Sequence, residues 1–418
     1  MKQLLLPILF AMVSLQLSAQ TITPLYLNFN SHNEETDGGF GNSYNQKLDT
    51  FTKYRALLVQ MCDTLRTKGA KYNFQSDWRF LDGVNLYDNG TASTNGKNVC
   101  QWMHDDNNGL IEQDVHAHKT QKNETDVVWY YQQIGITPSN VVGGFLYDTV
   151  MTPSMPGSNW TDMQDSLPGK VHANMKWQFD VIWGGGTPNH SGSDLNTYGA
   201  WKPDTIHSVF THSPGKHLVL VGNGCSPLLH DSIPDVVASI TNEIRTFCYE
   251  INNGQLPAGK FYTACIQWNV RDLSQALIKD AAQLCDSLQP LVDAGYIVWK
   301  NHTEKLNIWQ NQYAAEPNQL LCDNVPQWNG TISTGIEESA LPVSLHLFPN
   351  PTNSKLQIVR SNNEVEEAEL LDMNGRKIKS FYFTAEALTI DVNFLSPGMY
   401  ILRSGNEVRR FIKTNATP

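Results

Sequence analysis

Basic residues are scarce in this sequence relative to acidic ones. Its 418 residues include 30 Lys and Arg against 41 Asp and Glu, which gives a formal net charge of −11. Non-specific binding to nucleic acid or to anionic membranes needs a basic face, so this balance argues against both kinds of partner. Charged residues make up only 17% of the chain and hydrophobic ones 40%, which is enough apolar material for a packed core and excludes a disordered chain. The length suits two or three domains.

Several catalytic signatures are also missing. The sequence has no Gly-x-Ser-x-Gly nucleophile elbow, no Walker phosphate loop and no His-Glu-x-x-His zinc motif. Its seven cysteines are widely spaced, without a Cys-x-x-Cys pair, and the odd number leaves at least one free thiol unless a partner chain supplies another. Cys225 follows a predicted strand, but it fits a structural thiol or a disulfide better than a nucleophile.

Only one long apolar run occurs, at residues 1–20. Lys2 provides a positive start, an apolar stretch follows, and Ser18-Ala19-Gln20 offers a small-residue cleavage context, which together predict a signal peptide. The apolar stretch is shorter than the ~20 residues that a membrane-spanning helix needs. No other segment approaches that length, so we expect an exported protein without a transmembrane segment.

The end of the chain differs in character from the rest. Residues 326–341 are rich in turn formers and predict a linker. Residues 342–418 contain short alternating runs separated by turn signals, a pattern that predicts a small β-sandwich. The runs lie at 344–348, 355–359, 367–371 and 399–402.

Motifs in this tail indicate where the protein is exported and say nothing about a reaction. FPNPTNSKL (348–356), LLDMNGRKI (370–378) and FLSPGMYILR (394–403) resemble the C-terminal sorting domain of the type IX (Por) secretion system of Bacteroidota. The resemblance implies that the outer-membrane type IX machinery is a partner of this tail. It also implies a route through the periplasm to the cell surface or the medium.

Residues 21–325 alternate strand-like and helix-like segments. We expect strands at 24–29, 71–74, 140–144, 217–221, 261–266 and 295–299, and helices at 49–68, 125–134, 234–252 and 273–294. Repeated strand–helix order over this length predicts a mainly parallel sheet, arranged as a distorted β/α-barrel of seven or eight strands.

Ionisable residues gather where the predicted strands end, which is where β/α-barrels carry their chemistry. His32 and Glu34 lie two residues apart after the first strand, and His116 and His118 repeat that spacing further along. In an extended chain, residues i and i+2 share a face, so each pair is suited to a common cation. We therefore predict a site for a divalent metal, zinc in particular, held by these four side chains. The alternative interpretation is a set of hydrogen-bonded cleft or surface histidines.

A second resemblance rests on four motifs of the main domain. LNFNSHNEE (27–35), YNFQSDWRFL (72–81), DVHAHKTQKN (114–123) and VVGGF (141–145) resemble the glycoside hydrolase/deacetylase superfamily. Its members are distorted β/α-barrels that include polysaccharide deacetylases and metal-dependent α-mannosidases. This chain lacks the Asp-Asp pair that deacetylases carry after the first strand, and His116 and His118 are two rather than four residues apart. These departures leave the general base and the reaction type open.

The leading hypothesis is a secreted, metal-dependent hydrolase that acts on a carbohydrate and removes an acyl group. The candidate catalytic residues are Asp77, Asp114 and Glu35, and the candidate substrate contacts are Trp78, Trp183, Trp201, Asp148 and Glu304. One alternative is a glycosidase with two carboxylates drawn from Asp77, Asp114, Asp148 and Glu304. The other is a non-catalytic glycan-binding surface protein, in which the tryptophans are core residues.

Overall fold

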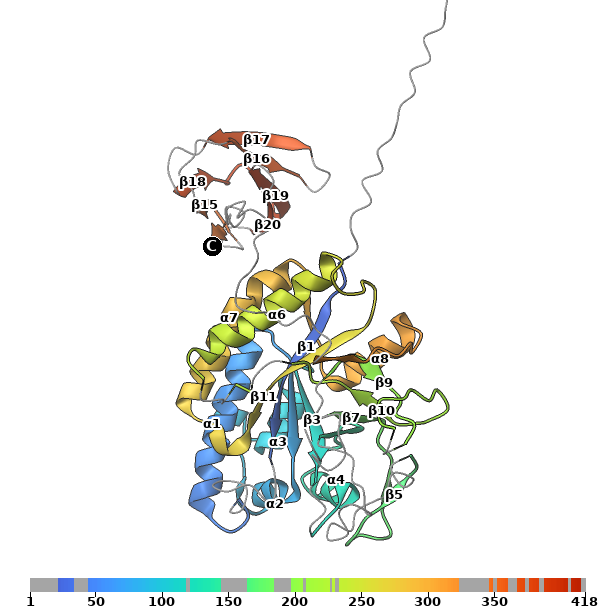
Figure 1. Cartoon of the computed structure of the whole chain (residues 1–418). Coiled ribbons are helices and arrows are strands. Elements are labelled where there is room, and N and C mark those ends of the chain that lie inside the picture. The colour runs from blue at the N-terminus through green and yellow to red at the C-terminus, as the bar shows by residue number, and fades with distance from the viewer. Residues whose placement is uncertain are drawn as a thin grey trace, which may run out of the picture. The chain divides into compact units, whose positions relative to one another are not determined.

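The computed structural model describes most of the chain, in two compact units that are treated separately here, Met1–Gln327 and Trp328–Pro418 (Figure 1). In the larger unit it describes residues 22–33, 44–117, 121–143, 164–183, 197–205, 208–225, 228–229 and 233–322. In the smaller unit it describes residues 346–348, 352–359, 367–372, 376–382, 387–404 and 407–414. The predicted signal peptide and the predicted linker lie outside these ranges.

The larger unit is built on one nine-stranded sheet in the order β11-β1-β2-β3-β4-β7-β10-β9, with β12 pairing to β1. Every neighbouring pair is parallel except β10 and β9. The strands are β1 (Leu25–His32), β2 (Tyr72–Ser76), β3 (Ile111–His116), β4 (Val141–Gly143), β7 (Val181–Trp183), β9 (Ala200–Trp201), β10 (Val219–Val221), β11 (Tyr262–Asn269) and β12 (Ile297–Trp299). Each strand predicted for residues 21–325 overlaps one of them.

The expected barrel does not close as a continuous ladder in the described residues. Strand β9 pairs antiparallel with the outer edge of β10, so β11 has no strand partner on that side among the described residues. The two ends of the sheet nevertheless meet, because the Cys265 N–H donates to the Asn223 carbonyl at 2.9 Å. The Thr263 hydroxyl adds a second contact by donating to the Gly222 carbonyl at 2.8 Å. The sheet is therefore strongly curved, with an inner and an outer face.

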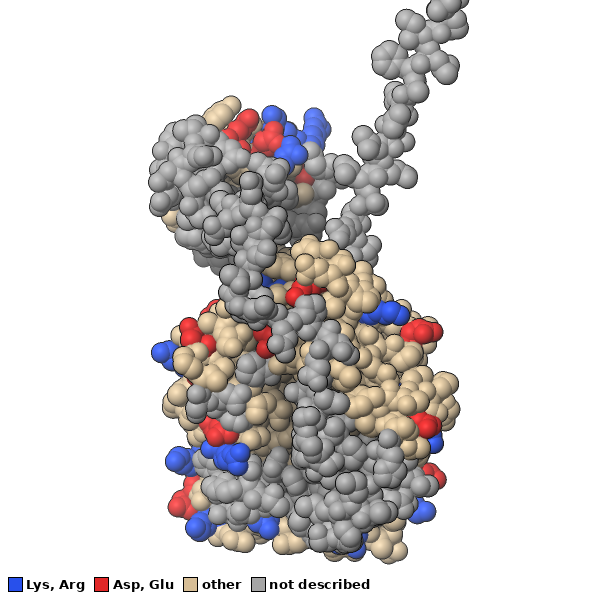
Figure 2. Space-filling model, viewed as in Figure 1, with Lys and Arg blue, Asp and Glu red and all other residues tan. Residues whose placement is uncertain are grey.

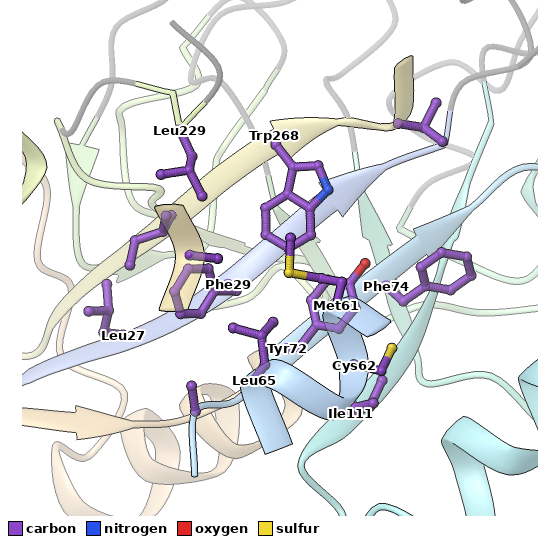
Figure 3. Close-up of a cluster of buried hydrophobic side chains, with 14 of the residues drawn as sticks. Leu27, Phe29, Met61, Cys62, Leu65, Tyr72, Phe74, Ile111, Leu229 and Trp268 are labelled. Carbon is purple, nitrogen blue, oxygen red and sulfur yellow. The ribbon is translucent and has the colours of Figure 1, made fainter. Parts of the chain in front are cut away.

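The outer face packs against helices. These are α1 (Leu48–Thr67), α2 (Trp78–Tyr87), α3 (Val99–Asp105), α4 (Glu124–Gln133), α6 (Val236–Asn252) and α7 (Gln275–Asp293). Figure 3 shows Leu27 and Phe29 of β1 and Tyr72 of β2 pointing toward Met61 and Leu65 of α1. Burying such a side chain stabilises the fold by about 1.5–3 kcal/mol, and the predicted helix at 49–68 arises from this apolar stripe.

The inner face is divided into a polar and an apolar half. On β1, β2 and β3 the inward positions are largely polar and buried, as at Asn28, Asn73 and Asp114. The inward residues of β4, β7 and β10 are apolar and form a cluster with Leu306 and Trp309 of α8 (His302–Gln312). Helix α8 thus fills the interior of the curved sheet, an arrangement that the sequence patterns did not predict.

Cys225 forms a disulfide with Cys322, 97 residues further along the chain. It therefore serves as a bridge and not as a nucleophile. The bridge joins the segment after β10 to the end of the larger unit, where the short strands β8 (Thr197–Tyr198) and β13 (Leu320–Leu321) pair. Another short pair, β5 (Leu167–Pro168) and β6 (Lys176–Trp177), lies beside α4.

The smaller unit consists of two antiparallel sheets. One has the order β14-β15-β18 and the other β17-β16-β19-β20. Their strands are β14 (His346–Phe348), β15 (Lys355–Val359), β16 (Glu367–Leu371), β17 (Lys377–Tyr382), β18 (Ala387–Asp391), β19 (Gly398–Ser404) and β20 (Glu407–Lys413). Buried residues from both sheets, such as Ile358 and Leu402, share one apolar cluster.

Charges of both signs are scattered over the described surface that Figure 2 shows. Among the described residues, no helix combines the length and the apolar character that a membrane crossing requires.

Candidate active site at the carboxyl ends of the parallel strands

The last residues of β1 and β3 are both histidines, and their rings meet. The imidazoles of His32 and His116 stack with centroids 4.5 Å apart and an interplanar angle of 27°. Trp183, at the end of β7, stands edge-on to His32 with centroids 5.2 Å apart. His32 is 7% exposed and His116 only 2%, so both rings are buried at the carboxyl edge of the sheet.

A backbone carbonyl fixes the orientation of His116. Its Nδ1 lies 2.8 Å from the carbonyl oxygen of Gly143, the last residue of β4. Because a carbonyl can only accept, Nδ1 carries the proton, and in the neutral ring Nε2 carries the lone pair. Metal-binding histidines are commonly held in this way, by a hydrogen bond from the other ring nitrogen to a carbonyl.

A glutamine supports the histidine pair from β2. Gln75 accepts a hydrogen bond from Asn30 Nδ2 and donates one to Asp114 Oδ2, each at 3.2 Å. The Gln75 side chain also packs directly on Gly143, since a Cβ built on that glycine would lie 1.8 Å from Gln75 Oε1. Glycine at 143 therefore permits the close approach of β4, whose carbonyl holds His116.

Asp114 lies two residues before His116, inside the curved sheet. Its carboxylate accepts hydrogen bonds from Ser139 Oγ at 2.6 Å and Asn73 Nδ2 at 2.9 Å. Burial raises the pKa of Asp114 well above its usual range, and the nearby Glu112 carboxylate raises it further. The pKa of Glu112 is also raised, mainly by burial. The interior can therefore hold a protonated carboxyl group directly below the histidine pair.

Asp77 and Trp78 follow the end of β2. Asp77 is fully buried and caps α2, because its Oδ1 accepts the Phe80 N–H at 3.0 Å. Trp78 is half-buried at the start of α2, with the ammonium group of Lys122 4.8 Å from its ring centroid. Both residues are at the carboxyl edge, as predicted, and Asp77 has a structural role there.

Glu304 lies at the opposite end of the sheet. Its carboxylate caps α8 and forms an ion pair at 3.1 Å with Lys71, which immediately precedes β2. The reason is that β12 pairs with the first residues of β1, at Leu25, and not with its end. The chain therefore enters α8 near the amino ends of the strands, far along β1 from His32.

The two remaining tryptophans are core residues in this structure. Trp201 is completely buried, and its indole N–H donates to the Val209 carbonyl at 2.6 Å. Trp183 is 1% exposed and packs edge-on against His32. Neither ring presents an open face on which a sugar could stack.

Four other predicted site residues fall outside the described parts of the chain. They are Glu34, Glu35, His118 and Asp148. Within the described residues, no group of three or more His, Cys, Asp or Glu side chains is arranged to hold a metal ion. The two described imidazoles fit the chemistry of a zinc-like site, because His116 has the ring orientation that such ligands adopt.

The interior also contains charged residues that the sequence patterns did not single out. Lys305 of α8 is fully buried and donates to Asn28 Oδ1 and, at 2.9 Å, to the Ala264 carbonyl. Burial lowers the pKa of Lys305, and it lowers the pKa of His302 well below its usual value. The sequence did contain a sign of this polar interior. Polar residues alternate with apolar ones in β1 and β3, as in Asn28-x-Asn30-x-His32, which is typical of a strand with one polar face.

The tail belongs to a known class of export signals. A family model described as "Secretion system C-terminal sorting domain" matches residues 346–414. This confirms the predicted sorting domain. The chain is exported by type IX secretion, to the cell surface or into the medium.

Comparison with individual proteins adds three distant likenesses. A protein from Parabacteroides distasonis described as a glycoside hydrolase/deacetylase is 11% identical, over 88% of this chain and 87% of that one, with a TM-score of 0.42. The GH57 branching enzyme TK1436 from Thermococcus kodakaraensis is 8% identical, over 68% and 71%, with a TM-score of 0.36. A thermostable endoglucanase from Alicyclobacillus acidocaldarius is 18% identical, but the match spans only 18% of this chain and 15% of that one, with a TM-score of 0.15.

No curated protein sequence matches this chain. Likenesses this low carry no activity over to it.

Proposed function

We propose that this protein is a secreted, metal-dependent hydrolase that removes acyl groups from a carbohydrate. The observation that carries the proposal is the stacked, buried pair of His32 and His116 at the carboxyl edge of a parallel sheet. The motif resemblance to polysaccharide deacetylases and the export domain support it. A nearly closed β/α-barrel remains the architecture that we propose for the larger unit.

The proposed metal ligands are His32 and His116, together with Glu34 and His118. A bound zinc-like cation would lower the pKa of a coordinated water to ~7 and polarise an acyl carbonyl. The chain itself contributes orientation and shelter. The Gly143 carbonyl holds the His116 ring, Gln75 packs on Gly143, and Trp183 covers one side of His32.

Asp114 is the described carboxyl group best suited to moving a proton. Burial and the neighbouring Glu112 carboxylate raise its pKa, which favours the protonated form that a general acid needs. Asp77 and Glu35 are the other candidates, although Asp77 already serves α2 through Oδ1. Among the proposed substrate contacts, Trp78 is half-buried at the rim, and Asp148 remains a proposal.

The glycosidase alternative needs two carboxylates on either side of a sugar bond. Pairs that include Glu304 are not favoured, because that residue lies at the amino end of the sheet beside Lys71. The described pair that remains is Asp77 and Asp114, but Asp77 Oδ1 already caps α2 and Asp114 is hydrogen-bonded inside the sheet. We therefore keep acyl removal as the proposed reaction.

Elemental analysis tests the metal site directly. The purified protein is expected to hold about one zinc-like ion per chain, and a His32→Ala/His116→Ala variant is expected to lose it. His104→Ala is the matched control, because His104 is an exposed histidine on α3. Acetate release from acetylated polysaccharides should follow the metal content. Equal metal in all three proteins would refute the site, and a metal-containing protein that releases no acetate but binds glycans would favour a binding function.

A further inference from the structure

Four half-buried rings form a continuous strip from α2 across α4 to the loop between β5 and β6. The members of this aromatic strip are Trp78, Tyr130, Trp129 and His172. Successive ring centroids are 5.8 Å apart from Trp78 to Tyr130, 5.0 Å from Tyr130 to Trp129, and 4.0 Å from Trp129 to His172. Trp129 and His172 stack face to face at 11°, so each covers one face of the other, and Tyr130 stands at 84° to Trp129. The faces and edges that stay partly exposed are apolar surface of the kind that sugars contact.

The strip is held rigid by a buried carboxylate. Asp126 of α4 accepts hydrogen bonds from the backbone N–H groups of Lys170, at 3.0 Å, and His172, at 2.9 Å. It also contacts the His172 ring at Nδ1, at 3.1 Å. The His172 ring is therefore fixed against Trp129. Because the ring is already ordered, a ligand that binds there loses little entropy by immobilising it.

A lysine lies within the strip without an acidic partner. Lys122 Nζ is 4.8 Å from the Trp78 centroid and 5.2 Å from the Tyr130 centroid. Aromatic rings attract an ammonium group but do not neutralise its charge. Over the described part of the chain, no ion pair to a carboxylate involves Lys122. Arg79, with Cζ 5.3 Å from the Trp78 centroid, adds a second cation.

Three carboxylates lie near the strip, and all are buried. Asp77 and Asp126 accept backbone N–H groups, and Glu124 lies two residues from Lys122. The strip therefore combines the half-buried cations Lys122 and Arg79 with half-buried aromatic rings, in a protein whose net charge is −11.

The strip begins beside the histidine pair. In the register of β2 and β3, Ser76 lies opposite Val115, so Asp77 is level with His116 and Trp78 is one residue beyond it. A chain of sugar units lying on the strip would extend from the carboxyl edge of the sheet outward over α4. Figure 1 shows α2 and α4 at the same end of the sheet.

We propose that the aromatic strip and Lys122 form a binding subsite for an anionic polysaccharide. The rings would carry the sugar faces, and Lys122 would bind a carboxylate on one unit. This inference rests on the proposed function, because it names the substrate class of that site.

Binding to two matched polymers tests the subsite. Polygalacturonate and its methyl-esterified form share a backbone but differ in charge, and calorimetry on the full chain gives the affinity for each. Wild type is expected to prefer the acid form by about fivefold, the size of one partly exposed ion pair. Lys122→Met keeps the length of the side chain and should abolish the preference, whereas Trp129→Ala should weaken both polymers by up to about tenfold. Lys279→Met, on the exposed side of α7, is the matched control and should change neither.

The outcomes separate this inference from the proposed hydrolysis. His104→Ala, at an exposed histidine on α3, should bind both polymers like wild type, whether or not the protein is an enzyme. Preference for the acid form that survives in Lys122→Met, or binding that is equally lost in Lys279→Met, would overturn the subsite. Failure of wild type to bind either polymer would overturn it as well, while acetate release could still support the hydrolase.

Discussion

The rings of His32 and His116 touch although their strands are not neighbours. Strand β2 lies between β1 and β3, so the two backbones are roughly 10 Å apart, yet the ring centroids are only 4.5 Å apart. Both side chains must therefore point toward each other across β2, and the curvature of the sheet brings them closer together. The pair depends on the tight packing beneath it as much as on the two histidines.

Gly143→Ala tests that dependence. The new Cβ would lie 1.8 Å from Gln75 Oε1, and Gln75 is buried and hydrogen-bonded to Asn30 and Asp114, so it cannot swing away freely. We expect a loss of about 1–3 kcal/mol in the free energy of unfolding. We also expect metal affinity to fall about 10–100-fold, because the Gly143 carbonyl orients His116. Gly215→Ala is the control, since nothing lies within 4 Å of its added Cβ. Urea unfolding and metal titration measure the two effects, and unchanged values in Gly143→Ala would contradict the packing described.

Asp77 offers a test that separates helix capping from catalysis. Asp77→Ala removes the acceptor for the Phe80 N–H and should cost about 0.5–2 kcal/mol of stability. Asp77→Asn keeps a capping oxygen and should retain most of that stability. If Asp77 is also the general base, the Asn variant will be stable but will release acetate more slowly. Equal stability of the Ala variant and wild type in thermal unfolding would refute the capping role.

The raised pKa of Asp114 predicts a pH dependence of stability. A carboxyl group whose pKa is higher in the folded state favours folding fully below its unfolded pKa of ~3.9, and this contribution is lost as the pH rises toward the folded pKa. Asp114→Asn removes this pH-dependent contribution to the free energy of unfolding, and it also removes the repulsion between the carboxylates at 112 and 114. From pH 5 to pH 8, wild type should therefore lose more stability than Asp114→Asn. His302, whose lowered pKa acts in the opposite direction, is present in both proteins and does not affect the comparison. The same slope in both, measured by urea unfolding, would show that Asp114 is not protonated more readily in the folded state.

The disulfide predicts both the number of reactive thiols and the loss of stability when the bridge is removed. In denaturant without reductant, five thiols should react, those of Cys62, Cys100, Cys248, Cys265 and Cys285. The double variant Cys225→Ser/Cys322→Ser should be about 2–5 kcal/mol less stable, because the bridge closes a long loop in the unfolded chain. Cys100→Ser, at a buried free thiol, controls for loss of a cysteine as such. A count of seven reactive thiols in the oxidised protein would show that the bridge does not form.

Local patterns predicted the strands and helices that have strong apolar periodicity. Helix α1 and strand β11 are examples, since each was expected within a few residues of its observed bounds. The same patterns did not reveal α8, whose apolar residues Leu306 and Trp309 pack inside the sheet rather than on its outside. Residues 302–304 were expected at the carboxyl edge, because a strand end normally leads there. Strand β12 pairs only with the first residues of β1, and Glu304 therefore lies at the amino end of the sheet.

The sequence alone determined the export of this protein, because the sorting domain is recognised from contiguous motifs within residues 346–414. It also placed His32 just beyond the predicted strand at 24–29, whereas the strand that ends in His116 was not among the predicted ones. Only the tertiary structure decided that these two rings stack, that Asp114 is buried with a raised pKa, and that Trp201 lies in the core. Each of these properties depends on neighbours that are distant along the chain, and the curvature of the sheet that brings them together follows from the packing of the whole domain.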